Sequence, residues 1–112
     1  MEIIKSYPDE LDPHTRYKLT MSPDIKRMKD AKDSVLPVES WAHYIDDSRG
    51  EEKEVLALAT TDGEVFATIS PIFIKEFFNI VEIFGDDPGE VKVFGGHTRA
   101  GREFIACTVA YR

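Results

Sequence analysis

The stretch from residue 64 to residue 84 constrains the fold most, because its hydrophobic period changes from that of a strand to that of a helix. Residues 65–69 alternate with a period of two, which is typical of a half-buried strand. Apolar residues then recur at three- and four-residue spacing, as on the buried face of a helix. Between the two patterns, Ser70 supplies a helix N-cap and Pro71 a first helical residue. We therefore predict a strand that is followed by a largely buried helix over residues 71–84.

The residues before this stretch predict a β-hairpin. Asp62 and Gly63 lie between two alternating runs, and Asp-Gly is a preferred pair for a two-residue type I′ turn. This turn would place Ala59 opposite Phe66, on a face of otherwise small side chains. A nucleic-acid base could stack on that ring, and the alternative is that the N-terminal segment packs over it. The opposite, core face would carry Leu56, Leu58, Val65, Ala67 and Ile69.

Three further strand patterns complete the predicted order of elements. One begins at about Val38, and two follow the helix at residues 91–94 and 102–111. The order is then strand, strand, strand, helix, strand, strand. A five-stranded Greek-key barrel of this kind is the OB-fold, whose strands and loops bind oligonucleotides. We predict a mainly β, OB-fold-like barrel over residues 34–112. A split α+β sheet with one packed helix is the alternative, because element order does not prove that a barrel closes.

Residues 1–33 are predicted to form a helical or irregular extension of this barrel. Asp12-Pro13 and Ser22-Pro23 each read as an N-cap followed by a first helical residue. The second of these helices has few apolar anchors, so we expect it to lie on the domain and not in its core.

Length and composition are those of one soluble domain, residues 1–112, with 42% hydrophobic and 31% charged residues. No apolar run approaches the roughly 20 residues that span a bilayer, and no secretory signal begins the sequence. We therefore expect a cytoplasmic protein without a membrane partner. Cys107 is the single cysteine, so it can form neither an internal disulfide nor a thiolate metal site by itself.

The formal net charge of -7 argues against nucleic-acid binding through the whole surface. The charges are unevenly distributed, however. Residues 33–90 are strongly acidic, whereas residues 16–32 and 91–112 carry an excess of Lys and Arg. Two basic segments therefore flank an acidic middle, although solvation of the surface is the better explanation for any single lysine.

The segment GGHTRAGREF predicts a flexible hairpin tip on which basic and aromatic residues interleave. Arginine side chains can contact phosphates there, while phenylalanine rings stack with bases. A basic loop with a buried phenylalanine is the alternative for this segment. Trp41 is a further candidate, because neither face of its strand is purely apolar. The predicted nucleic-acid-binding residues are Trp41, Phe66, Lys92, Phe94, Arg99, Arg102 and Phe104.

Catalysis is not expected from the sequence. His14, His43 and His97 are widely separated and form no metal-binding spacing, and no nucleophile has a recognisable activating neighbour. The glycine-rich segment lacks the Lys-Ser/Thr pair and the following helix of a phosphate-binding loop. We therefore expect a protein that is not an enzyme and that uses no cofactor or metal.

Three segments, LDPHTRYKLTMSPDIKRMKD, TTDGEVFATISPIFIKEFFNIVEIFG and GGHTRAGREFIACTV, resemble a family of phage and prophage single-stranded DNA-binding proteins of Gram-positive bacteria. The resemblance covers most of the chain. It implies an OB-type fold and a role in DNA replication or recombination. One departure is the ending VAYR, which lacks the acidic tail that often recruits partner enzymes.

Two functions remain open at this point. The first is non-catalytic coating of single-stranded DNA, for which a homodimer or higher oligomer would increase avidity. The second is a phage protein-interaction module whose acidic residues between Asp46 and Glu64 engage a host protein without binding nucleic acid.

Overall fold

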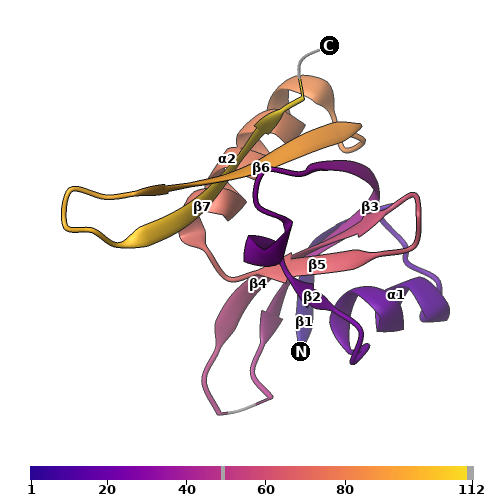
Figure 1. The fold of residues 1–112 in the computed structure, drawn as a ribbon. Helices are drawn as coiled ribbons and strands as arrows, with labels where there is room; N and C mark the ends of the chain where they lie inside the picture. The colour runs from indigo at the N-terminus through magenta and orange to yellow at the C-terminus, as the bar shows by residue number, and fades with distance from the viewer. Residues whose placement is uncertain (49, 111–112) are drawn as a thin grey trace.

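The computed structural model describes residues 1–48 and 50–110 as a mostly β protein with two α-helices. Figure 1 shows the elements in chain order. They are β1 (Glu2–Tyr7), α1 (Pro13–Thr20), β2 (Lys26–Arg27), the 3₁₀ helix η1 (Met28–Ala31), β3 (Val35–Asp46), β4 (Lys53–Thr60), β5 (Val65–Thr68), α2 (Pro71–Phe84), β6 (Glu90–His97) and β7 (Glu103–Val109).

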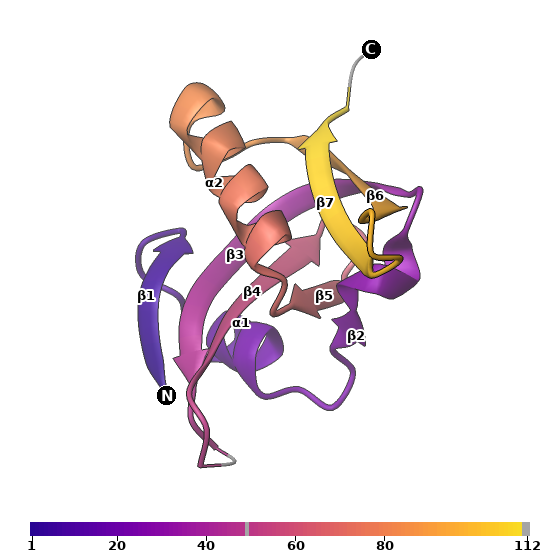
Figure 2. The same ribbon diagram turned by 90° about the vertical axis from the view of Figure 1, so that its left-hand side faces the viewer.

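The strands form one strongly curled sheet with the order β2-β5-β4-β3-β6-β7, and β1 pairs with β3 outside this path. β3 is 12 residues long and pairs with β4 along most of its length. Its first residues pair instead with β6, which carries the sheet round the curve visible in Figure 2. The order β3, β4, β5, α2, β6, β7 confirms the predicted OB-like arrangement. β1 and β2 are additional strands that the sequence did not predict.

The barrel-like sheet is not closed by strand pairing within the described residues. The path runs from β2 and β5 at one end to β7 at the other, and these ends do not pair with each other. The result is a half-barrel with an open seam between its two end strands, β2 and β7.

Both faces of the curled sheet are covered by apolar contacts. On one face, α2 buries Phe73 and Phe77 against Trp41, and the Trp41 and Phe77 rings meet edge to face at 5.5 Å. On the other face, Leu19 of α1 packs with residues of β3 and β4 that include Tyr44. Figure 2 shows the two helices on different sides of β3 and β4. Two apolar clusters therefore share the same central strands.

The predicted helix of residues 71–84 is confirmed, together with its caps. The Ser70 hydroxyl accepts a 3.3 Å hydrogen bond from the backbone N–H of Phe73. Gly85 ends the helix with a φ of 88°, and its N–H donates to the carbonyl of Val81. The cap of the first N-terminal helix is also confirmed, because Asp12 accepts a hydrogen bond from Thr15 N–H at 2.8 Å.

The second predicted N-terminal helix is wrong. Residues 26–27 form β2, which pairs in parallel with β5, and only the short η1 follows. Met28 is 1% exposed and belongs to the core beneath α2. Pairing with β5 and burial of Met28 override the local helix signals of Ser22-Pro23, so this segment contributes to the core through Met28 while its charged side chains stay exposed.

The predicted turn between β4 and β5 is also wrong by one residue. Gly63 N–H donates to the carbonyl of Thr60 at 3.0 Å, and Thr60 N–H donates to the carbonyl of Glu64 at 2.8 Å. The loop therefore has three residues and a glycine at positive φ, which is the other common hairpin solution. As a result Leu58 lies opposite Phe66.

β3 contains an irregularity that period-two reasoning does not anticipate. The register shifts by one between Val38 and Ser40, so Glu39 forms a β-bulge. Val38 and Trp41 therefore face the same cluster beneath α2, while Tyr44 faces the cluster beneath α1.

No helix among the described residues is long and apolar enough to span a membrane.

Candidate nucleic-acid interface

An open groove of about 840 Å³ lies along the unpaired seam of the sheet. Its walls come from three places, namely the segment of β2 and η1, the connection from β5 to α2, and the β6–β7 hairpin. These elements surround the same region in Figure 2. The residues that shape it most are Arg27, Lys29, Lys32, Ile69, Ile72 and Phe104.

One wall of the groove is basic. Arg27, Lys29 and Lys32 are exposed and contribute their side chains to the lining. Asp30 lies among them and pairs with Arg27 at 3.4 Å, but both side chains are more than half exposed, so this pair is weak. The segment therefore keeps a net positive charge next to the groove, although the whole chain is acidic.

The opposite walls are mainly apolar, and Glu103 is the one charged residue on them. Ile69 is 56% exposed and Ile72 is 44% exposed, and both side chains line the groove. Phe104 is half-buried and packs against neither of the two core clusters. Its ring lies against Gly96 of the neighbouring strand. Cations on one side and exposed apolar groups on the other are what a strand of nucleotides needs for its phosphates and its bases.

The β6–β7 hairpin carries most of the residues that the sequence predicted for binding. Its register places Lys92, Phe94 and Phe104 on one face, as the alternation predicted. Phe94 is half-buried and, like Phe104, lies outside both core clusters. Arg99 and Arg102 are exposed at the tip, where Arg102 N–H donates to the Thr98 hydroxyl. Of these residues only Phe104 lines the groove.

Trp41 is not part of any exposed surface. Its side chain is 0% exposed, and its rings contact both Phe77 and Phe78 edge to face. Its Nε1–H donates to the carbonyl oxygen of Asp86 at 2.8 Å. The prediction that Trp41 stacks on a base is therefore wrong for this fold, because both faces of its ring are occupied by the protein.

Phe66 is also a core residue, for a reason that follows from the corrected turn. A slip of one residue in a hairpin reverses which side chains face the core. Phe66 therefore joins Leu56 and Leu58 beneath α2 and is only 6% exposed. The prediction of an open stacking platform on this ring is wrong.

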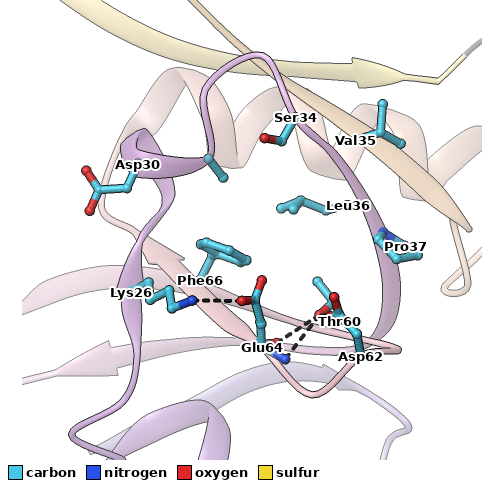
Figure 3. A pocket seen from close by; sticks show the side chains of 11 residues that line it. Lys26, Asp30, Ser34, Val35, Leu36, Pro37, Thr60, Asp62, Glu64 and Phe66 are labelled. Carbon is cyan, nitrogen blue, oxygen red and sulfur yellow. Dashed lines mark hydrogen bonds and ion pairs between the residues drawn. The ribbon is translucent and has the colours of Figure 1, made fainter.

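A second cavity, of about 460 Å³, lies beside Phe66 and is shown in Figure 3. Lys26 spans its edge, where its Nζ pairs with Glu64 at 2.8 Å and lies 5.7 Å from the centre of the Phe66 ring. The Glu64 carboxylate raises the pKa of Lys26, and the Thr60 hydroxyl lowers the pKa of Asp62 by donating to its carboxylate. Lys26 thus already pairs with the Glu64 carboxylate and lies over the Phe66 ring.

The groove residues from β2 and η1 were missed as a site. The sequence signal was present, because Arg27, Lys29 and Lys32 belong to the basic segment of residues 16–32. Their position beside the β6–β7 hairpin depends on the pairing of β2 with β5, which local patterns did not predict.

The acidic residues of the alternative function do not form one face. Asp46, Asp47, Glu51 and Glu52 lie at the β3–β4 turn, whereas Asp62 and Glu64 lie at the other end of β4. No group of His, Cys, Asp and Glu within the described residues is arranged to hold a metal ion.

No family model, curated protein or solved structure matches this chain.

Proposed function

We propose that this protein binds single-stranded DNA without catalysis, in the groove between the β6–β7 hairpin and the segment of β2 and η1. The observation that carries the proposal is the pairing of a basic wall, Arg27, Lys29 and Lys32, with an apolar wall that includes Phe104. Phosphates would contact the cations, and unstacked bases would contact the apolar wall. A duplex keeps its bases stacked inside, so it offers this groove its phosphates but not its bases.

The net charge of the chain does not oppose this proposal, because binding depends on the charges near the groove. At physiological salt the Debye length is about 8 Å, so exposed carboxylates at the far turns are largely screened. The acidic β3–β4 turn would instead limit binding to the basic side of the molecule. The role in phage DNA replication or recombination and the oligomeric state remain predictions.

Titration of a fluorescein-labelled oligo-dT of about 16 nucleotides, followed by anisotropy, tests the proposal. We expect saturable binding at micromolar protein that weakens steeply as salt rises from about 50 to 200 mM. A duplex of the same length should compete poorly. No anisotropy change at micromolar protein and low salt would contradict the proposal and leave the acidic interaction module as the better hypothesis.

A matched pair of triple variants locates the site. Arg27→Gln, Lys29→Gln and Lys32→Gln together remove three cations of the groove. Each phosphate contact on a single strand contributes about 0.7 to the slope of log affinity against log salt, so the slope should fall by about 2. The control variant removes the same number of positive charges outside the groove, by Arg16→Gln, Lys18→Gln and Lys53→Gln together. It should leave the slope nearly unchanged. Equal effects of the two triple variants would show that binding does not use the groove.

A further inference from the structure

Gly95 and Gly96 are adjacent residues of β6, and side chains of adjacent strand residues point to opposite faces. Unlike the other described glycines, these two do not have a positive φ, so their backbone conformation does not require glycine. Each of them pairs with β7 in the hairpin register. Backbone conformation therefore does not explain the two glycines. The space that a side chain would occupy at each position does.

Lys32 occupies the space that a side chain at Gly95 would fill. A Cβ atom on Gly95 would lie 2.7 Å from Cε of Lys32 and 3.3 Å from its Nζ. The aliphatic part of Lys32 thus lies directly on the hairpin backbone, which brings its ammonium group to the groove wall. Because only the end of a flexible side chain is in the way, an alanine here would displace Lys32 without disturbing the strand.

Phe104 occupies the corresponding space at Gly96, on the other face of the hairpin. A Cβ atom on Gly96 would lie 2.8 Å from Cζ of the Phe104 ring. The tip of the ring therefore lies against the backbone of β6, and the half-buried side chain lines the groove. An alanine at Gly96 would push the ring away from the strand.

We propose that Gly95 and Gly96 are positioning residues, which seat a phosphate-binding cation and a base-stacking ring on opposite faces of one hairpin. This inference rests on the proposed binding of single-stranded DNA. A ligand that uses both groups must pass a phosphate to one face of the hairpin and a base to the other. An unpaired strand can do this, because its bases rotate freely away from its backbone.

Two alanine variants separate the two roles by their salt dependence. Gly95→Ala should reduce oligo-dT affinity several-fold at about 50 mM salt and lower the salt slope by about 0.7, as loss of one phosphate contact does. Gly96→Ala should reduce affinity by about tenfold with the slope nearly unchanged, as loss of base stacking does. Both variants should keep the parent's melting temperature or raise it, because alanine restricts the unfolded chain more than glycine.

Double variants show whether each glycine acts through its own neighbour. In a Lys32→Ala background, Gly95→Ala should have no further effect on affinity, and in a Phe104→Ala background the same should hold for Gly96→Ala. Nuclear Overhauser contacts between the Gly95 Hα and the Lys32 Hε protons report the seating directly. They should be present in the parent without any oligonucleotide.

The outcomes distinguish this inference from the proposed function. If the parent binds oligo-dT but the glycine variants bind equally well, the positioning inference is overturned and the function stands. Full additivity in the double variants also overturns the inference, because the glycines would then act through the backbone. If the parent binds no oligonucleotide, the proposed function fails first and the inference fails with it.

Discussion

The indole Nε1–H of Trp41 donates a 2.8 Å hydrogen bond to the backbone carbonyl of Asp86. This bond joins the middle of β3 to the connection between α2 and β6, 45 residues later in the chain. Lys5 lies over the same ring at 6.0 Å and pairs with the Asp86 carboxylate at 3.3 Å, so β1 also converges on this point. The single tryptophan of β3 thus contacts both β1 and the connection between α2 and β6, and it belongs to the core of the fold.

Trp41→Phe should therefore destabilise the protein. It removes the only donor on this side chain and leaves the Asp86 carbonyl without that partner, at an expected cost of about 1 to 3 kcal/mol. Urea unfolding followed by circular dichroism measures this, since the variant lacks tryptophan fluorescence. Lys5→Gln is a suitable comparison, because its pair with Asp86 is about half exposed and should contribute less than about 1 kcal/mol. Identical unfolding midpoints for Trp41→Phe and the parent would rule out a structural role for the hydrogen bond.

Gly63 has a φ of 90° in the turn between β4 and β5. Gly63→Val should destabilise the fold by more than about 1 kcal/mol, because a β-branched residue is strained at this φ. Gly63→Asn should cost less, since asparagine tolerates positive φ better than other side chains. Thermal unfolding of both variants tests the order, and a valine variant as stable as the asparagine variant would contradict it. Nothing lies within 4 Å of a Cβ at this position, so steric clash does not complicate the comparison.

The sequence predicted the elements whose determinants are local. The helix that begins at Pro71 is one example, because its cap, its first residue and its apolar spacing all lie within 15 consecutive positions. The order of five strands and one helix followed in the same way, and it was enough to predict the OB-like arrangement. The two added strands, β1 and β2, depend instead on pairing with distant parts of the chain.

The errors have tertiary causes that the sequence does not display. Asp62-Gly63 fits both a two-residue and a three-residue hairpin loop, and the two differ by one position of register. That single position decides whether Phe66 lies in the core or on the surface. The bulge at Glu39 has the same effect on Val38 and Trp41. The exposure of strand residues was therefore predicted less well than that of the hairpin tip, where Arg99 and Arg102 are exposed in any register.

Cys107 provides a test of the packing between α2 and β7. The thiol is 3% exposed, its Sγ lies 3.7 Å from the Phe73 carbonyl, and burial raises its pKa to about 12. The thiolate is thus favoured in the unfolded chain, where the ordinary pKa is 9.0. Stability should be unaffected by this group below pH 9 and should fall as pH rises from 9 towards 12. Cys107→Ala should flatten that part of the curve relative to the parent.

The same thiol should react slowly with a disulfide reagent at pH 8 in the folded protein. The reactive species is the thiolate, and the raised pKa lowers its fraction on the order of a thousandfold. Unfolding in urea should restore the rate of an ordinary cysteine. Rapid labelling of the native protein would show that α2 does not cover β7 as described.

Phe104 and Arg99 should affect oligonucleotide binding differently. Phe104→Ala should weaken binding by roughly 1 to 3 kcal/mol with little change in salt dependence, because stacking releases no counterions. Its melting temperature should stay close to that of the parent, since the ring packs against neither core cluster. Affinity and melting temperature measured together separate this outcome from loss of folding.

Arg99→Ala should lower the salt slope by about 0.7 if the hairpin tip contacts a phosphate, as the basic tip predicts. The comparison variant is Lys53→Ala, an exposed cation at the start of β4, for which no change in slope is expected. A parent-like slope for Arg99→Ala would restrict the phosphate contacts to the groove wall formed by β2 and η1.

Within the described residues the end strands β2 and β7 do not pair, and this open seam has a topological consequence for a polymeric ligand. A polymeric ligand can enter a closed ring only by threading its end through it. A groove that is open along one side can bind an internal stretch of the polymer from that side. Binding in this seam would need no search for an end, and release would need no threading. A covalently closed circle of DNA would then be as good a ligand as a linear strand of the same sequence.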